Sequence, residues 1–246
     1  MKKIIFIFLL LFSVVVASDE VSLNDFSDEF SEEKVEIIDP LSGYNRVMTS
    51  FNDKAFIYFL NPVAKGYATV VPEVARTGVS NFFDNILFPI RFVNNLLQFK
   101  FKNSAEELGR FLINSTFGIL GFMDPASEQL KWEEHNEDFG QTLGFYGVGS
   151  GFHIVLPFLG PSNVRDSLGL VADGYISPIN NFGEKENFDY KIPSNDEQTI
   201  YIASGKVINK TSLNLGKYEN IKKDALDLYP FLRDIYEQRR EKEIKE

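Results

Sequence analysis

Apolar residues recur at intervals of three and four along most of this chain, which is the spacing of amphipathic helices. One helical face after residue 40 collects Tyr44, Val47, Met48, Phe51, Ala55 and Tyr58. The same period continues through Val79, Phe82, Phe83, Ile86, Leu87, Ile90, Val93, Leu96 and Leu97. Pro89 must kink or split that second element, because it lacks an amide hydrogen. The pattern predicts an all-α fold.

Further helices follow from the same spacing and from capping residues. Residues 104–117 predict an amphipathic helix whose inward face carries Ala105, Leu108, Phe111 and Leu112. Asp39-Pro40 and Asp124-Pro125 each combine a good N-cap with a proline suited to the first helical turn, while Asn61-Pro62 and Val71-Pro72 mark other boundaries. Residues 163–175, 200–215 and 218–236 predict three more helices, with a polar surface loop over 181–198.

Glycine changes the pattern between residues 139 and 169, where we expect a loop or hairpin. We interpret residues 140–151 as a hinge or gate, because glycine reaches backbone angles closed to other residues. The alternative is a rigid turn whose glycines only satisfy local angles. The candidate gate residues are Gly140, Gly144, Phe145, Tyr146, Gly147, Gly149, Gly151 and Phe152.

The two ends of the chain differ in character from its middle. Residues 1–18 are expected to be a signal peptide, with Lys2 and Lys3 before an apolar run and Ala17-Ser18 at the cleavage site. A permanent anchor is the alternative, but the run is shorter than the roughly 20 residues of a spanning helix. An acidic flexible leader over 19–38, a helical domain over 39–236 and a charged, fraying tail over 237–246 complete the expected organisation.

Charge and cysteine content exclude several classes of function. Loss of two lysines with the signal peptide leaves 23 basic against 35 acidic residues, a net charge of −12. Such a surface repels nucleic acid, and it also repels anionic lipid head groups at long range. Any membrane contact must therefore rest on apolar burial. The 24 phenylalanines suit broad apolar faces. The absence of cysteine excludes a thiol nucleophile, a thiolate metal site and a lipidated cysteine within this sequence.

Candidate catalytic and ligand-binding motifs are weak. Ser150, His153 and Asp166 could form a triad, but no Gly-x-Ser-x-Gly elbow supports one. His135 lies in the acidic run of residues 133–138, which matches no helical zinc motif and which we interpret as a solvated loop. The glycines of residues 147–151 fit neither the dinucleotide fingerprint nor the phosphate loop. We therefore expect no enzyme activity and assign no catalytic, cofactor-binding or metal-binding residue.

Several separate motifs, in order from residue 39 to residue 173, resemble the MlaA (VacJ) family. The opening motif runs from Asp39 to Asn52 and includes Pro40, Gly43, Asn45, Arg46 and Phe51. It is followed by matching segments at residues 62–67, 71–72, 76–82, 94–98, 109–116, 121–124, 138–144, 146–149, 156–162 and 165–166. Many motifs in register make this resemblance specific, although each would be weak alone.

The resemblance implies a ring-like helical protein in the inner leaflet of the outer membrane, on its periplasmic face. Such proteins remove phospholipid mislocalised to the outer leaflet through an amphipathic channel and so maintain lipid asymmetry. They pass the lipid to a soluble MlaC-type periplasmic carrier and associate with trimeric porins. The resemblance also places the glycine-rich segment beside the channel. No cofactor is implied.

This chain departs from the family pattern, in which a lipidated cysteine usually follows the signal peptide. We expect a mature N-terminus near Ser18 or Asp19 without an acyl chain, so seating must rely on apolar helix faces and partners. Phe82, Phe83, Ile86 and Ile90 are the candidate membrane-facing residues, with burial in the core as the alternative. A porin-binding scaffold and a periplasmic lipase or esterase remain the competing functions.

Overall fold

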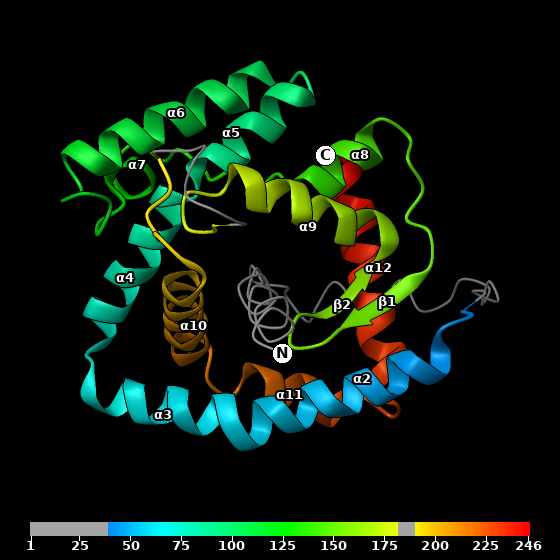
Figure 1. Cartoon of the computed structure of the whole chain (residues 1–246). Helices are drawn as coiled ribbons and strands as arrows, with labels where there is room; N and C mark the ends of the chain where they lie inside the picture. Colours follow the sequence, from blue (N-terminus) through cyan, green and yellow to red (C-terminus); the bar gives the residue numbers. More distant parts are fainter. Residues whose placement is uncertain (1–38, 182–189) are drawn as a thin grey trace.

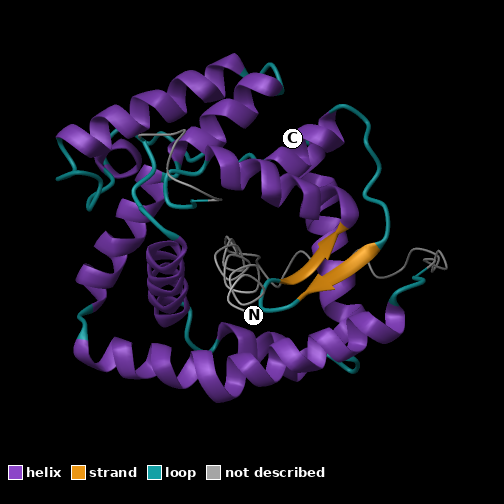
Figure 2. Cartoon of the chain, viewed as in Figure 1, coloured by secondary structure: helices purple, strands orange, loops and turns teal. Residues whose placement is uncertain are grey.

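The computed structural model describes residues 39–181 and 190–246, so the expected signal peptide and leader lie outside the described residues. Helices dominate the described chain, and two short strands form a hairpin (Figure 2). The elements are α2 (Ser42–Ala55), the π-helix η3 (Phe56–Leu60), α3 (Asn61–Val70), α4 (Glu73–Ile86), α5 (Phe88–Leu97), α6 (Phe101–Thr116), α7 (Pro125–Glu128), α8 (Phe139–Phe145), β1 (His153–Leu156), β2 (Gly160–Asn163), α9 (Val164–Ile176), α10 (Asp196–Leu213), α11 (Lys217–Asp224) and α12 (Leu228–Lys245). The all-α prediction is confirmed.

The helices are arranged as a ring (Figure 1). α2 and α3 form one side, α4 forms the next, α5 and α6 lie opposite α3, and the hairpin with α9 and α12 closes the circuit. α10 stands along the inner side of α4 and packs against both α3 and α4. None of the described helices is both long and apolar enough to cross a membrane.

Proline and aspartate set several of the helix boundaries as expected. Asp124 caps α7 by accepting a hydrogen bond from the amide of Ser127. Pro89 lies in the first turn of α5, and the helical run breaks at Leu87 between α4 and α5. Asp39 is not an N-cap, however, because α2 begins at Ser42 and the Asp39 carboxylate instead accepts a hydrogen bond from the Tyr229 hydroxyl.

The burial of α6 is inverted relative to the prediction. On α6 the buried side chains are Ser104, Glu107, Arg110 and Asn114. Ala105, Leu108 and Leu112 are exposed and Phe111 is half-buried, so the apolar face predicted to point inward points outward. The polar face is buried because its groups satisfy one another across neighbouring helices, which is what allows a polar group to leave water.

The end of the chain also differs from the prediction. The single helix expected over 218–236 is two helices, α11 and α12. The charged tail expected to fray from residue 237 continues α12 as far as Lys245, and Arg240 within it is buried. The charge of a terminal segment does not by itself decide whether that segment is ordered, because buried partners elsewhere in the chain can pair with its charged side chains.

Candidate functional site

Large apolar side chains are exposed on most of the ring. Val70, Val74, Tyr58 and Phe117 are between 78% and 85% exposed, and aromatic or aliphatic residues of α5, α6, α9 and α10 are exposed with them. Polar residues outnumber apolar ones among the buried side chains of the described residues. Isolated exposed apolar residues are ordinary, but a surface on which they recur along several elements indicates contact with a partner or a membrane.

Two asparagines of the opening motif bind the hairpin to α2. Asn45 is fully buried and accepts a hydrogen bond of 2.8 Å from the amide of Val155, while its own amide donates to the carbonyl of His153. Asn52, two turns further along, donates to the carbonyl of Leu156 and accepts from the amide of Phe158. The two amides therefore hold β1 and its turn against α2.

The other residues of that motif have smaller roles in the packing. Arg46 forms an exposed ion pair with Asp227 at 2.6 Å. Phe51 contacts Phe158 edge to face, with ring centroids 5.0 Å apart. Gly43 has open space around its α-carbon, and Pro40 lies in the turn before α2.

Gly140 and Gly144 are packed into helix α8 and do not lie in a loop. A Cβ atom on Gly140 would lie 2.5 Å from Asp166 Oδ1, and one on Gly144 would lie 2.6 Å from Ile244 Cδ1. Gly169 of α9 approaches the backbone of Gly140 equally closely. These glycines permit close contact of α8 with α9 and α12, so the structure corrects the prediction of a loop at the start of this segment.

The second half of the segment, residues 146–152, is an exposed connection between α8 and β1. Gly147 and Gly151 have positive φ angles of 81° and 71°. Gly149 does not need a positive φ angle and has open space around it. Phe145, Tyr146 and Phe152 are exposed beside these glycines, and the Tyr146 hydroxyl donates to the carbonyl of Leu97.

A buried ion cluster joins α8, α9 and α12. The Arg240 guanidinium donates to both carboxylate oxygens of Asp138 at 2.8 Å and to Asp166 at 3.0 Å. Burial alone would raise the pKa of Asp166, but hydrogen bonds and the charge of Arg240, with further bonds from Arg165 and Tyr236, lower it to about 2. Asp166 is therefore an ionised structural group.

Asp173 has the opposite character, although it lies near the same cluster. It is buried, accepts a hydrogen bond from Asn94 at 2.9 Å and caps the amide of Phe139 at 3.0 Å. Burial and the negative charge of Asp138 raise the pKa of Asp173 to about 7. This carboxyl can change its protonation state near neutral pH, and it lies where α5, α8 and α9 meet.

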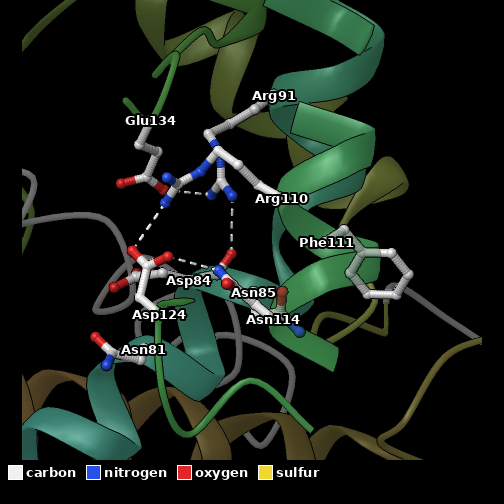
Figure 3. Close-up of a pocket in the computed structure, with 9 residues that line it drawn as sticks. All are labelled: Asn81, Asp84, Asn85, Arg91, Arg110, Phe111, Asn114, Asp124 and Glu134. Carbon is white, nitrogen blue, oxygen red and sulfur yellow. Dashed lines mark hydrogen bonds and ion pairs between the residues drawn. The ribbon is translucent and has the colours of Figure 1, made fainter. Parts of the chain in front are cut away.

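A polar cavity of about 130 Å³ lies among α4, α5, α6 and the segment after α7 (Figure 3). It is lined by Asn81, Asp84, Asn85, Arg91, Arg110, Phe111, Asn114, Asp124 and Glu134. Arg91 pairs with Glu107 at 2.7 Å and with Glu134 at 2.8 Å, and Arg110 pairs with Asp124 at 3.0 Å. The cavity therefore contains both signs of charge.

The groups considered for catalysis do not assemble into a relay. The ring of His153 contacts the carboxylate of Glu237 at 2.7 Å through Nδ1, and its buried Nε2 has no hydrogen-bond partner. Ser150 hydrogen-bonds to the carbonyl of Gly151, while Asp166 belongs to the Arg240 cluster. The three side chains considered for a triad make no hydrogen bond to one another.

The acidic run around His135 is also a packing element. His135 contacts Glu106 at 2.6 Å, and Glu137 is buried against Lys100 and Gln98. Within residues 39–181 and 190–246, no group of three or more acidic or histidine side chains could hold a metal ion. The interpretation of this run as a solvated loop was wrong for Glu137, because its partners lie on another part of the chain.

The candidate membrane-facing residues are each half-buried: Phe82, Phe83, Ile86 and Ile90. Phe82 stacks on Phe122, with ring centroids 4.9 Å apart. Sequence reasoning missed the buried charges Arg91, Glu107 and Arg110, which it could have found as the polar residues opposite each exposed apolar stripe.

Comparison with known proteins agrees with this architecture. The family model described as MlaA lipoprotein matches residues 37–243. The intermembrane phospholipid transport system lipoprotein MlaA of Escherichia coli is 40% identical over 142 residues, which cover 56% of each chain. A protein of Rickettsia bellii is 30% identical over 211 residues, covering 85% of this chain and 78% of the relative.

A solved structure gives the same result at the level of the fold. It is described as "Structural basis for maintenance of bacterial outer membrane lipid asymmetry", and it matches with a TM-score of 0.68 and 30% identity. The match covers 85% of this chain and 100% of that chain. With the family model spanning nearly all the described residues, these likenesses show that the chain belongs to the MlaA lipoprotein family.

Proposed function

We propose that this protein is the outer-membrane component of an intermembrane phospholipid transport system. It removes phospholipid mislocalised to the outer leaflet and so maintains the lipid asymmetry of the outer membrane. The observation that carries the proposal is the inverted burial of a ring of helices, with polar groups packed between elements and large apolar side chains exposed. The name of the E. coli relative refers to intermembrane phospholipid transport, and that of the solved structure refers to the maintenance of outer-membrane lipid asymmetry.

The inverted burial favours a position within one leaflet. Helices that lie in the interface plane bury an apolar face in the acyl region without crossing the bilayer. An exposed apolar surface carries a large free-energy cost in water, about 25 cal/mol for each Å². Seating in the inner leaflet of the outer membrane, on the periplasmic side, removes that cost. The protein would be exported there by its signal peptide.

The proposed route for the lipid passes the loop of residues 146–152. Phe145, Tyr146 and Phe152 supply exposed aromatic surface. A Cβ atom added at Gly147 or Gly149 would have no neighbour within 4 Å, and one at Gly151 would contact only Val164. Gly140 and Gly144 form the fixed base from which this loop extends. We propose the loop as the gate, and α8 as its support.

The proposed partners are a trimeric porin and a soluble MlaC-type periplasmic carrier. A porin would stabilise the position of the ring in the membrane, and a carrier would receive phospholipid on the periplasmic face. The net negative charge of the chain disfavours contact with nucleic acid, so we propose no nucleic-acid partner. Phospholipid transfer needs no cofactor and no covalent step, so the proposal assigns no enzyme activity.

Lipid analysis of the purified protein tests the function. The full chain is purified in mild detergent, and bound phospholipid is quantified by mass spectrometry against an unrelated outer-membrane protein extracted in the same way. In parallel, the gene is introduced into cells that lack their own family member, and outer-leaflet phospholipid is measured. We expect phospholipid bound above the control and restored asymmetry. A porin complex without lipid or restored asymmetry would indicate the scaffold function instead.

A further inference from the structure

Residues 111–123 lead from the middle of α6 to the turn before α7 and contain no charged side chain. The part that follows α6 lies at the outer edge of the ring (Figure 1). Its two glycines are buried, whereas its five large side chains are between 42% and 78% exposed: Phe117, Ile119, Leu120, Phe122 and Met123. We call residues 117–123 the apolar loop.

The backbone of the apolar loop is strained at its tip. Ile119 and Leu120 have φ angles of 54° and 58°, and Gly121 follows at 92°. Left-handed angles are unfavourable for any residue with a Cβ atom, and they are rare for a β-branched residue such as isoleucine. Glycine or asparagine would suit both positions better. The turn therefore carries two large apolar side chains at an energetic cost, which is typical of a functional segment.

The main chain of the apolar loop is hydrogen-bonded within the protein. Four consecutive amides, those of residues 120–123, donate to main-chain carbonyls, which belong in order to Ser115, Asn114, Ile119 and Gly118. Water would satisfy these amides wherever the loop was exposed to it, but acyl chains cannot. A loop that contacts lipid must therefore pair its amides internally, as this one does.

The polar side chains of this stretch are paired in the same way. Asn114 donates to the carboxylate of Asp124 at 2.8 Å. Asn85 of α4 donates to the Ser115 hydroxyl at 2.9 Å, and the Thr116 hydroxyl donates to a carbonyl one turn earlier in α6. A protein interface typically contains about one hydrogen bond for each 100–200 Å², whereas the polar groups here are already used. This pairing favours acyl chains over a protein partner.

The apolar loop is held against α4 and continues its apolar surface. The Phe122 ring stacks on Phe82, one of the candidate membrane-facing residues, with centroids 4.9 Å apart. A Cβ atom on Gly78 would lie 3.2 Å from the carbonyl oxygen of Phe122, and one on Gly121 would lie 2.5 Å from Asn85 Nδ2. These close approaches fix the base of the loop while its tip stays exposed.

We propose that the apolar loop inserts into the acyl region of a phospholipid leaflet and fixes the height of the ring at the membrane. The inference rests on the proposed function and deepens it by naming an element that contacts lipid. Insertion is shallow, about 5–10 Å, as for other elements that lie in the interface. Asp124, paired with Arg110 at 3.0 Å, marks the polar boundary behind the loop. Insertion by apolar burial alone suits a chain of net negative charge.

Matched asparagine substitutions test the insertion. Leu120 and Lys131 are both exposed and have φ angles of 58° and 59°. Asparagine tolerates these angles, so both variants should melt at or above the temperature of the unaltered chain. In sedimentation with vesicles of phosphatidylethanolamine and phosphatidylcholine, Leu120→Asn should partition about tenfold more weakly, because it loses one buried leucine. Lys131→Asn should partition as the unaltered chain does.

The absence of native cysteine allows depth to be measured at single positions. A nitroxide attached to Ile119→Cys or Leu120→Cys in the same vesicles should collide more often with oxygen, which concentrates among acyl chains, than with a water-soluble nickel chelate. Lys131→Cys should show the reverse preference. Val74→Cys, on a highly exposed side chain of α4, reports whether the ring contacts lipid elsewhere.

A measurement on the unaltered chain does not depend on the folding of a variant. Phosphatidylethanolamine that carries a diazirine on its acyl chain is activated by light in the vesicles. Trypsin then releases residues 111–131 as one peptide, because it cleaves after Arg110 and Lys131. Fragmentation of that peptide should place the lipid adducts on residues 117–123 rather than on residues 125–131.

The outcomes separate this inference from the proposed function. A Leu120 label that meets the nickel chelate while the Val74 label lies in lipid would overturn the insertion of the apolar loop alone. Unchanged partitioning of folded Leu120→Asn would do the same, and dipolar coupling between Leu120 labels would identify a contact between two copies instead. Labels that are all in water, with no lipid adduct on the unaltered chain, would count against the membrane position in the proposed function itself.

Discussion

At the scale of single residues, buried polar side chains hold the helices against one another, as buried apolar side chains do in most proteins. Asn45, Asn94, Asn95 and Glu107 are fully buried, and each is hydrogen-bonded to a group on another segment. A satisfied buried polar network specifies one arrangement of its elements, because any displacement leaves groups unpaired. Asp173 differs from these residues in that its charge depends on pH near neutrality.

Asp173 should make stability depend on pH. Its pKa is raised from 3.8 to about 7 in the folded protein, so folding favours the protonated form. That stabilisation is complete below the pKa of the unfolded chain and is lost as pH rises through about 7. We expect the free energy of unfolding to fall by on the order of 3 kcal/mol between pH 4 and pH 8 from this group.

Asp173→Asn provides the comparison, because asparagine is uncharged throughout that range. The variant should lose this component of the pH dependence, as measured by denaturant unfolding in detergent at several pH values. Asp138 and Arg240 face the same site. The charge of Asp138 and the hydrogen bonds to it outweigh the effect of burial and raise the pKa of Arg240, so Arg240 stays charged over this range and contributes a constant background. A slope equal in both proteins would show that Asp173 is already charged at pH 5.

At the scale of elements, the glycine-rich segment divides into two parts whose glycines have different structural roles. Gly140 and Gly144 lie within α8, where close approach of α9 and α12 leaves no room for a side chain. Gly147, Gly149 and Gly151 lie in the connection to β1, where only a Cβ atom added at Gly151 would have a neighbour within 4 Å. Any gate must therefore be the connection, because the helix is held by the Arg240 cluster.

Alanine substitutions should separate the two parts. Gly149→Ala meets no steric contact and no positive φ angle, so we expect unchanged stability with altered outer-leaflet phospholipid in cells. Gly147→Ala adds backbone strain of about 1 kcal/mol from its positive φ angle. Gly140→Ala should lower the melting temperature, because its Cβ would collide with Asp166. Unchanged lipid asymmetry in Gly149→Ala at full protein level would contradict the gate.

At the scale of the whole molecule, apolar surface on the outside and polar contacts between helices make a protein suited to lipid. Water would penalise this surface, whereas acyl chains would not. The candidate membrane-facing residues of α4 and α5 are half-buried, so their burial alone does not assign them to the exposed apolar surface or to the contacts between helices. Phe83 therefore has two possible roles, membrane contact and packing against its neighbours.

Phe83→Asp should distinguish those roles. We expect weaker membrane association with a retained cooperative melt, because a charge in the acyl region is unfavourable while the polar contacts between helices persist. Thr77→Asp adds the same charge at an exposed position of α4 and serves as the control. Membrane fractionation and thermal unfolding are measured on both variants. Loss of the cooperative melt in Phe83→Asp would instead identify a packing residue.

Helical periodicity, the proline breaks and the Asp124 cap were readable from the sequence, because they depend on interactions within a few residues of the backbone. Family membership was readable too, because it rests on the order of motifs. The direction of each helical face was not, since periodicity identifies a stripe without saying whether protein, water or lipid lies against it. Only the tertiary structure decided that Leu108 points outward while Glu107 is buried, that Gly140 supports a helix contact, and that Arg240 holds the end of the chain in place. Each of these depends on partners from distant parts of the sequence, which burial and ion pairing bring together only after folding.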